Sequence, residues 1–472
     1  MTNITELQDL EHMPSAAIVA PAGHGKTEII VDIVKRTRGR CLVLTHTNAG
    51  VEAVRKRMRK REIPNSKYKV LTIAGFCMYW CFAYPSTAHF TQIEEEPCDE
   101  DYKQLYAGAK IIFGKEWAQN VLSASYSKVI VDEYQDCLQI QHEIFTTISS
   151  FIPIIVLGDP MQAIFGWAGQ LVDWKLIDFP IIELSTKPWR WEKSNPALGK
   201  WLTKVRSKML SVLNGDTVTL NLRNIDNVVE IISKDALSWK KIWECTSPFN
   251  SVTFITQWLS QQVEFSRMTR GLFQNDEAQE CRDLFEYAYS FDSLRGAELG
   301  YRVLAFLAQS ATHVSSELSS YFKHLEKRDL DFSKIKKHKD LGFLITELCQ
   351  KKSQDIIISI IEWFESQCKF YIYRKELIAE MKRGLRYSKI HNISVLKATE
   401  EIRRNPKLQR KYSKFRFLAS RTVLSKGLEF ECVLVDMRQP LCAKDFYVAI
   451  TRATKMVYII TNNSNNISFR VH

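Results

Sequence analysis

The sequence predicts an α/β protein built on parallel sheets, and three apolar stretches carry this prediction. Residues 16–20 form a short apolar run that leads through a glycine-containing turn into the mainly apolar run 29–34. Residues 128–137 and 152–169 each begin as a similar apolar run and continue into carboxylate or amide side chains. Such runs are typical of buried strands in parallel sheets, which bind ligands at the carboxyl ends of their strands.

The first stretch, AAIVAPAGHGKTEIIVDIV over residues 16–34, has the order of strand, loop and helix that a phosphate-binding loop requires. It follows the pattern G-x-x-x-x-G-K-[ST] except at the first position, where Ala20 stands. Alanine is tolerable there because Gly23 and Gly25 are the positions that must let the backbone approach a phosphate. The alternative is a glycine-rich turn that precedes a lysine by chance.

The polar groups of this loop predict ATP and Mg²⁺ as ligands. Its backbone N–H groups and the N-terminus of the following helix would hold phosphate oxygens. Lys26 would reach the β- and γ-phosphates, and the Thr27 hydroxyl would bind Mg²⁺. The predicted nucleotide-binding residues of the loop are Gly23, His24, Gly25, Lys26 and Thr27.

The other two strand ends predict the catalytic groups of ATP hydrolysis. The segment KVIVDEYQDC ends in paired carboxylates. Asp132 would join Thr27 in binding Mg²⁺, and Glu133 would orient and deprotonate the attacking water. Gln162, which follows the next strand, would sense the γ-phosphate at the same edge of the sheet.

Charge and aromatic content favour a polyanionic partner. The 472 residues, enough for two to four domains, carry a net charge of +12 and a pI near 9.0. Residues 369–416 hold fifteen Lys and Arg against four Glu, interleaved with aromatic side chains. This mixture suits a phosphate backbone with stacked bases, and a solvated helical face is the alternative. Trp167 would offer a further stacking platform, with burial in the core as its alternative.

The cysteines and the hydropathy pattern indicate a cytoplasmic protein without a membrane partner. The eleven cysteines include no C-x-x-C pair, so buried thiols in a reducing cytosol are expected rather than a metal site. No apolar run approaches membrane-spanning length, and no targeting signal is expected before the phosphate loop.

Six segments, in this order, resemble motifs of superfamily 1 helicases of the UvrD, Rep and PcrA group. They are LVLTHTNAGVEAVRKRM (42–58), LTIAGFC (71–77), LSTKPWRW (184–191), SVTFITQ (251–257), SKGLEFECVLVD (425–436) and FYVAITRATKMVYI (446–459). The resemblance implies two RecA-like P-loop motor domains, with Lys26 and Arg452 in different lobes of an ATP-driven DNA helicase.

The resemblance also assigns roles to residues outside the phosphate loop. Arg190 and Arg452 would be arginine fingers on the γ-phosphate, and Trp189 would lie against the adenine. The segment from 425 to 436 would contact the nucleotide through Gly427 and through Glu429, which would reach the sugar. The implied DNA-binding residues are Thr45, His46, Thr47, Phe76 and Trp167.

Three positions depart from the pattern of the resembled family. Ala74 and Val423 stand where the family has histidine, and Ala168 stands where it has the arginine that follows the stacking tryptophan. These positions concern DNA binding and its coupling to ATP, so the departures leave ATP hydrolysis as the expectation that does not depend on processive unwinding.

The resemblance divides the chain into six segments. The first RecA-like domain would comprise 1–75 and 127–192, interrupted by a small accessory insertion at 76–126. The second would comprise 193–270 and 412–472, interrupted by a helical accessory insertion at 271–411.

Small accessory regions and overall size resemble the helicase component of Gabija-type antiphage systems. This resemblance implies movement on single-stranded DNA or DNA ends, 3′ to 5′, with a nuclease partner of the OLD type. Two alternatives remain: a stand-alone DNA-repair helicase, and a regulatory ATPase that senses DNA or nucleotide without productive unwinding.

Overall fold

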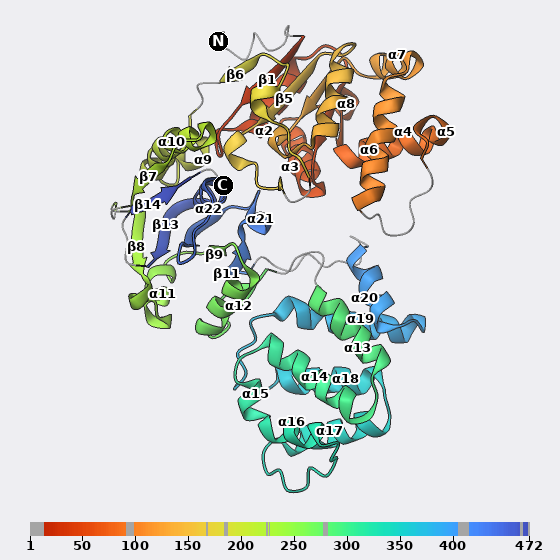
Figure 1. Ribbon diagram of the computed structural model, residues 1–472, viewed down its shortest axis with the longest axis vertical. Coiled ribbons are helices and arrows are strands. Elements are labelled where there is room, and N and C mark those ends of the chain that lie inside the picture. Colours follow the sequence, from red (N-terminus) through yellow and green to blue (C-terminus); the bar gives the residue numbers. More distant parts are fainter. Residues whose placement is uncertain are drawn as a thin grey trace. The chain divides into compact units, whose positions relative to one another are not determined.

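The computed structural model divides the chain into two compact units (Figure 1). It describes residues 14–90, 99–166, 169–183, 187–222, 225, 227–276, 282–404, 415–462 and 466–470. Unit 1 comprises 1–220, 442–454 and 468–472, and unit 2 comprises 221–441 and 455–467. The units differ from the predicted domains in three places, because 193–220, 442–454 and 468–472 belong to unit 1.

Unit 1 is built on a six-stranded parallel sheet in the order β3-β2-β4-β5-β1-β6. Its strands are β1 (Ser15–Val19), β2 (Cys41–Thr45), β3 (Tyr68–Thr72), β4 (Lys128–Val131), β5 (Ile154–Gly158) and β6 (Ile181–Glu183). The β1, β2, β4 and β5 strands are buried along almost their whole length, as expected for a sheet covered on both faces. The predicted α/β class is confirmed.

The two faces of this sheet bury different hydrophobic clusters because successive side chains alternate. Ala16 and Ile18 face one cluster, to which α2 (Lys26–Arg36) and α3 (Asn48–Lys60) contribute. Ala17 and Val19 face the other, to which α8 (Gln139–Ser149) contributes. The second cluster also contains the helices that follow β3, namely α4 (Ile73–Ala83), α5 (Pro85–Ala88), α6 (Asp99–Phe113) and α7 (Glu116–Ser125).

The remaining elements of unit 1 come from distant parts of the chain. They are α9 (Trp189–Glu192), α10 (Pro196–Met209) and α22 (Ala443–Ile450). A separate two-stranded sheet pairs β7 (Val218–Asn221) with β14 (Asn466–Phe469). The 3₁₀ turns η2 (Tyr134–Asp136) and η3 (Pro160–Gln162) follow β4 and β5. Other 3₁₀ turns are η1 (Asn65–Lys67), η5 (Trp174–Leu176), η6 (Leu210–Asn214) and, in unit 2, η7 (Lys234–Ala236).

Unit 2 contains a second six-stranded sheet in the order β10-β11-β9-β12-β13-β8. The strands are β8 (Val229–Ser233), β9 (Val252–Thr256), β10 (Gln274–Asn275), β11 (Phe417–Arg421), β12 (Phe430–Asp436) and β13 (Ala453–Thr461). Four of its strand pairs run parallel, namely β10–β11, β11–β9, β12–β9 and β13–β8. The helices nearest to these strands in sequence are α11 (Trp239–Thr246), α12 (Leu259–Met268) and α21 (Thr422–Ser425).

The rest of unit 2 is helical and has a core of its own. Its helices are α13 (Arg282–Ser293), α14 (Gly296–Ser310), α15 (Val314–Glu317), α16 (Ser319–Glu326), α17 (Lys339–Gln350), α18 (Gln354–Glu365), α19 (Lys375–His391) and α20 (Val395–Arg404). They bury Leu, Ile and Phe side chains spaced three or four residues apart, such as Ile357, Ile360, Ile361 and Phe364 of α18. The predicted mainly helical insertion is confirmed. No helix in the described ranges is both long and apolar enough to cross a membrane.

Candidate active site

The phosphate loop connects β1 to α2 with two glycines in left-handed conformations. Gly23 has φ +71° and Gly25 has φ +87°, values that side chains rarely adopt. Gly25 is the N-cap residue of α2 and has no side chain with which to cap it, so the N–H groups of the first turn can point toward an anion. The sequence thus builds a backbone cradle at the position where Lys26 begins the helix.

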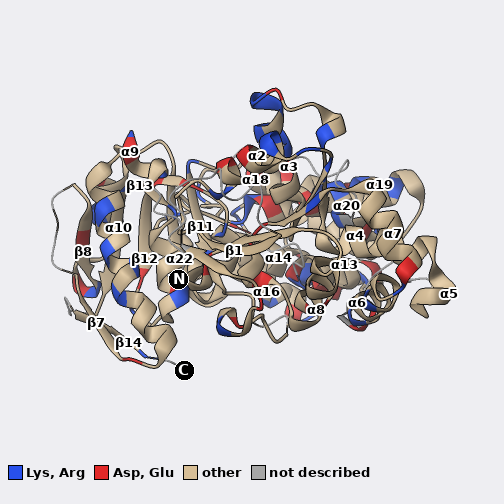
Figure 2. Cartoon of the chain, turned by 90° about the horizontal axis from the view of Figure 1, so that it is seen from above, with Lys and Arg blue, Asp and Glu red and all other residues tan. Residues whose placement is uncertain are grey.

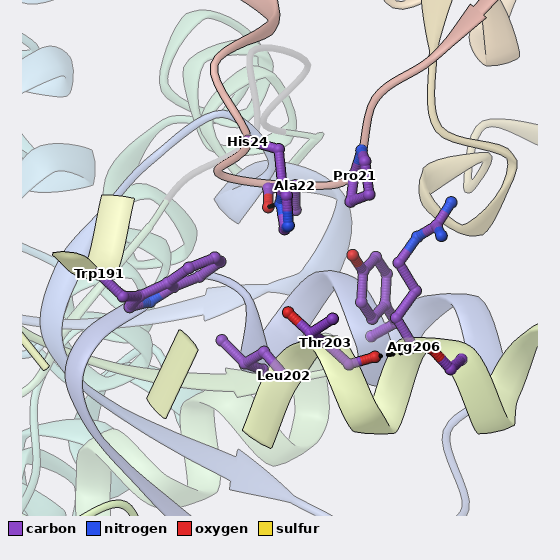
Figure 3. A pocket seen from close by; sticks show the side chains of 9 residues that line it. Pro21, Ala22, His24, Trp191, Leu202, Thr203 and Arg206 are labelled. Atoms are coloured by element: carbon purple, nitrogen blue, oxygen red, sulfur yellow. Dashed lines mark hydrogen bonds between the residues drawn. The ribbon is translucent and has the colours of Figure 1, made fainter. Parts of the chain in front are cut away.

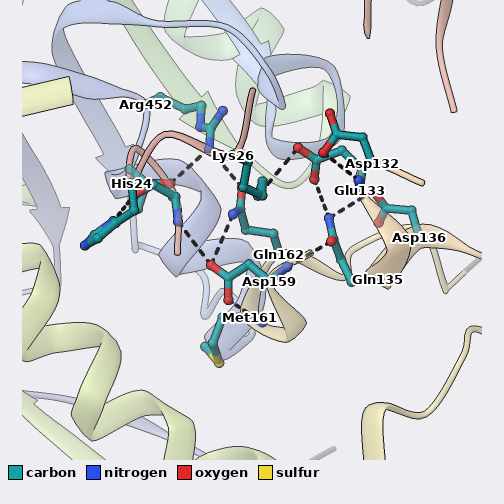
Figure 4. A network of polar contacts seen from close by, with 12 residues as sticks. His24, Lys26, Asp132, Glu133, Gln135, Asp136, Asp159, Met161, Gln162 and Arg452 are labelled. Carbon is teal, nitrogen blue, oxygen red and sulfur yellow. Dashed lines mark hydrogen bonds and ion pairs between the residues drawn. The ribbon is translucent and has the colours of Figure 1, made fainter. Parts of the chain in front are cut away.

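The paired carboxylates lie beside this loop, as Figure 4 shows. Lys26 Nζ is 3.6 Å from Glu133 Oε1. Glu133 has φ +54°, an uncommon conformation for glutamate, and its backbone N–H donates to Asp132 Oδ1 over 2.9 Å. The turn after β4 therefore directs the two carboxylates to different places within one site.

Burial makes Asp132 an unusual carboxyl group. Its exposed fraction is 7%, and burial, reinforced by the nearby charge of Glu133, raises its pKa from 3.8 to about 7 despite the opposing charge of Lys26. Because water does not solvate this buried carboxylate, a bound cation would strongly stabilise its ionised form. Carboxylate and hydroxyl oxygens are donors that Mg²⁺ prefers, so Asp132 and Thr27 remain the predicted Mg²⁺ ligands.

Gln135 and Asp159 connect Glu133 to the third strand end (Figure 4). Gln135 Nε2 donates to Glu133 Oε2 over 2.5 Å, and Gln135 Oε1 accepts from the Asp159 N–H over 3.0 Å. Asp159 is fully buried, and its Oδ2 accepts from Gln162 Nε2 over 3.1 Å and from the Ala22 N–H over 3.2 Å. One network of hydrogen bonds therefore joins the phosphate loop, which follows β1, to the groups that follow β4 and β5.

Arg452 reaches the same network from the far end of the chain. Its Nη2 donates to Gln162 Oε1 over 3.3 Å, and its Nε donates to the Val448 carbonyl over 3.0 Å. These contacts lie within unit 1, to which both Lys26 and Arg452 belong. Helix α22, which ends two residues before Arg452, packs on η3 and α10. The assignment of Lys26 and Arg452 to different RecA-like lobes stays a prediction.

Arg190 lies at the same end of α22. Its Nη1 donates to the carbonyl of Thr451 over 2.8 Å, one residue before Arg452. Arg190 therefore contacts the peptide group that joins Thr451 to Arg452, and both predicted arginine fingers belong to unit 1.

Two tryptophans flank Arg190 in different environments. Trp189 is 55% exposed, and its Cδ1 lies 3.4 Å from the position that a Cβ at Gly25 would occupy. An exposed indole at the exit of a phosphate loop offers a face on which a base can stack. Trp191 is 1% exposed, donates from Nε1 to the Ala453 carbonyl over 2.6 Å, and packs so tightly on Gly23 that a Cβ there would lie 2.6 Å from its ring.

A hollow of about 290 Å³, part of it open to solvent, lies against the phosphate loop (Figure 3). His24 lines it with an exposed fraction of 6%, and its Nδ1 is 2.8 Å from the Ala22 carbonyl. Burial is the main cause that lowers the His24 pKa, and the charges of Arg206 and Lys26 act in the same direction. The other lining residues are Pro21, Ala22, Trp191, Leu202, Thr203, Arg206, Ser207 and Tyr447.

The predicted DNA-binding residues have different environments. Thr45 is 2% exposed at the end of β2, His46 Nε2 is 3.5 Å from Cys137 Sγ, and the exposed Thr47 caps α3 by accepting from the Gly50 N–H over 3.0 Å. Phe76 is 2% exposed and stacks on Phe113, with ring centroids 5.3 Å apart. Because its side chain belongs to the core, we leave Phe76 out of the proposed DNA-contacting set.

Other positions singled out from the sequence fall outside unit 1 or outside the described residues. Trp167 and Ala168 lie outside the described residues. Gly427, with φ +84°, and the exposed Glu429 belong to unit 2. Their proposed contact with a nucleotide therefore stays a prediction.

Carboxylates of unit 2 pair with seven basic residues in the described part of region 369–416, whose Lys and Arg are blue in Figure 2. Arg374, which is 2% exposed, pairs with Asp283 over 2.6 Å, and Arg403 pairs with the buried Glu380. The further pairs of this region are Lys369–Glu317, Lys382–Glu365, Arg383–Glu380, Arg386–Glu362 and Lys389–Asp355. These contacts favour the alternative prediction, in which the region is a structural helical face.

Sequence reasoning missed four residues that complete the site: Gln135, Asp159, Trp191 and Arg206. Gln135 and Asp159 lay inside segments singled out for their neighbours, and the position of Asp159 directly after β5 was a usable signal. Arg206 lies in the last turn of α10, and nothing in the local pattern distinguishes it from the other basic residues of that helix.

Comparison with known proteins bears on the middle of unit 1. Residues 87–173 match the family model described as the UvrD/REP helicase N-terminal domain. The match supports a UvrD-like helicase. The matched segment contains Asp132, Glu133 and Gln162, but it ends before Arg190 and begins after the phosphate loop.

Other comparisons add less. A solved arterivirus nonstructural protein 10, a helicase in complex with DNA, is similar with a TM-score of 0.33 and 10% identity over 96% of this chain. The likeness spans 62% of that protein, and a TM-score at this level does not bear on function. A comparison with curated proteins finds no match.

Proposed function

We propose that this chain is an ATP-driven DNA helicase or translocase of the UvrD type, in which unit 1 binds and hydrolyses ATP. The observation that carries the proposal is the continuous polar network from Lys26 through Glu133 and Asp159 to Arg452. A strand-loop-helix cradle, a carboxylate pair, a glutamine and an arginine are the parts that phosphoryl transfer to water requires.

Nucleotide binding would rearrange the contact between Lys26 and Glu133. At 3.6 Å this ion pair is loose, and each side chain retains some exposure, 11% for Lys26 and 31% for Glu133. A γ-phosphate in the cradle would attract Lys26, which would release Glu133 to accept a proton from water. Thr27 and Asp132 would hold the Mg²⁺ that accompanies ATP and neutralises phosphate charge.

The two arginines would stabilise the charge that develops on the transferred phosphoryl group. Arg452 already contacts Gln162, and Arg190 contacts the adjacent peptide carbonyl of Thr451. An arginine finger contributes about 10³ to 10⁵ in rate, so loss of either one should be visible without loss of the fold. Trp189 would hold the adenine through its exposed face.

The DNA-binding surface of unit 1 would begin at the carboxyl end of β2. His46 and Thr47 are accessible there, beside the strand ends that carry the ATPase groups. The resemblance supports single-stranded DNA or DNA ends as the substrate and 3′ to 5′ as the direction. A cytoplasmic location and action with an OLD-type nuclease partner in antiphage defence rest on the same resemblance.

A regulatory ATPase that senses DNA without unwinding it is the second candidate. Ala74 and Val423 replace the family's histidines, and ion pairs within unit 2 occupy much of the basic region. The replaced histidines and the ion-paired basic residues would both weaken the DNA binding that processive movement needs. Neither feature changes the side chains proposed for ATP hydrolysis.

Strand displacement separates the two candidates. Duplexes with a 3′ or a 5′ single-stranded tail would be incubated with ATP, using wild type and Glu133→Gln as the matched inactive control. Displacement of the 3′-tailed duplex by the wild type alone supports the helicase. DNA-stimulated ATP hydrolysis without displacement supports the sensor, and co-expression with a neighbouring nuclease gene followed by size-exclusion chromatography tests the partner.

A further inference from the structure

Arg206 of α10 forms a nearly buried ion pair with Asp159. Its Nη2 lies 3.0 Å from Asp159 Oδ1, and the exposed fractions of the two side chains are 13% and 0%. Arg206 is sixteen residues after Arg190 and outside every segment that resembles a helicase motif. Its contact nevertheless falls on the residue at the centre of the candidate active site.

Asp159 hydrogen-bonds to both the phosphate loop and Gln162, whose relative position matters for the proposed reaction. One oxygen, Oδ2, accepts from the Ala22 N–H of the phosphate loop and from the side-chain amide of Gln162. The other, Oδ1, accepts from Met161 N–H over 3.2 Å and from Arg206. Four donors therefore converge on one carboxylate, and only Arg206 brings a positive charge.

The same peptide of the loop is held from its other side. The Ala22 carbonyl is 2.8 Å from His24 Nδ1, while its N–H donates to Asp159. In Figure 3 Arg206 lines the hollow next to this peptide. Tyr447 is a further lining residue of the hollow. Arg206 thus supports the phosphate loop from the hollow, through Asp159, without occupying the cradle itself.

A carboxylate without solvent needs a counter-charge, because neutral donors alone do not offset its desolvation. We propose that Arg206 is a positioning residue for ATP hydrolysis: it compensates the charge of Asp159, so that Asp159 can hold Ala22 and Gln162 at the same time. This inference rests on the proposed ATPase function. It assigns to α10 a role in setting the distance between the phosphate loop and the glutamine that faces the γ-phosphate.

The test compares Arg206→Met, which keeps an unbranched apolar stem but removes the charge, with Arg206→Lys, which keeps the charge. We expect kcat for ATP to fall about 10²-fold in Arg206→Met, the order that follows when a catalytic group is misplaced by about 1 Å. Arg206→Lys should recover at least a tenth of the wild-type kcat. The matched control is Lys110→Met, which removes an exposed ion pair with Glu143 in the same unit and should leave kcat unchanged.

A double variant distinguishes positioning from simple stability. Asp159→Asn removes the buried charge that Arg206→Met leaves unpaired, so the double variant should exceed Arg206→Met alone in kcat. Amide hydrogen exchange in the loop peptide 20–27, measured without nucleotide, should be faster in Arg206→Met and normal in Lys110→Met.

Two results would overturn the inference: Arg206→Met with wild-type kcat and wild-type loop exchange, or a double variant no better than Arg206→Met. The exchange measurement needs no activity, so it separates this inference from the proposed function. If the wild type hydrolyses no ATP yet Arg206→Met loosens the loop, the structural support by Arg206 stands and the ATPase proposal fails.

Discussion

Asp132 should take up a proton near neutral pH when no Mg²⁺ is bound, and this sets a measurable pH dependence. Burial and Glu133 raise its pKa from 3.8 to about 7 in the folded chain. Below pH 4 both the folded and the unfolded state carry the proton. Between pH 4 and pH 7 the unfolded state ionises while the folded state does not, so stability is lost as pH rises. Above pH 7 both states are ionised and the loss stops.

The magnitude follows from the difference between the two pKa values. A shift of roughly three units corresponds to about 4 kcal/mol across the whole range, and the part between pH 5 and pH 7 is about 3 kcal/mol. Asp132→Asn has no such titration. For a unit of this size 1 kcal/mol shifts Tm by about 2 to 4 °C, so the Tm advantage of Asp132→Asn should widen by roughly 6 to 12 °C between pH 5 and pH 8.

The assay is thermal unfolding of wild type and Asp132→Asn in EDTA at pH 5, 6, 7 and 8. Glu133→Gln is a useful third chain, because removal of the second charge should lower the pKa of Asp132 and shrink the effect. Addition of Mg²⁺ with a non-hydrolysable ATP analogue should reverse the order, since the ionised carboxylate then has a cation to bind. A Tm difference that stays constant from pH 5 to pH 8 would refute this account of the carboxylate pair.

Three further substitutions test other parts of the site. Glu133→Gln should bind ATP normally yet hydrolyse it about 10² to 10⁴ times more slowly, because only the proton acceptor is lost; normal turnover would show that Glu133 is not the base. Trp189→Ala should weaken nucleotide binding by about 1 to 3 kcal/mol, the range for one stacked base, whereas Trp243→Ala, an equally simple removal of an exposed indole in unit 2, should not. Gly23→Ala should cost at least about 1 to 2 kcal/mol of stability because of its left-handed backbone and should lose nucleotide affinity through its clash with Trp191. Gly166→Ala, with open space around its Cβ position, is the control, and equal Tm and affinity for the two alanine variants would contradict the packing argument.

Local pattern was enough to predict the first sheet and the groups at its strand ends. Buried strands β1, β4 and β5 are short apolar runs, and the residues that follow them include Lys26, Glu133 and Gln162, which the structure connects in one network. The parallel arrangement makes this convergence almost inevitable, because the carboxyl ends of all strands lie at one edge. Lys26, Glu133 and Gln162 were therefore predictable without knowing how the helices pack.

Tertiary packing determined the environments of Phe76, Arg452 and the basic region, which the local sequence pattern could not predict. Phe76 stands in a segment that resembles a DNA-binding motif, yet α6 supplies Phe113 as its partner and buries it. The position of Arg452 depends on where α22 packs, which no local sequence signal encodes. The pairing of the basic region is similarly a property of the fold, since Asp283 of α13 and Asp355 of α18 provide carboxylates for Arg374 and Lys389.

Steady-state ATP hydrolysis with and without single-stranded DNA tests the central claim most directly. Wild type should hydrolyse ATP with Mg²⁺, faster when DNA is present, while Lys26→Ala and Glu133→Gln should be inactive under both conditions. Lys26→Ala should also lose nucleotide binding, whereas Glu133→Gln should retain it. Wild-type turnover that persists unchanged in both variants would contradict the claim that this network is the site of ATP hydrolysis.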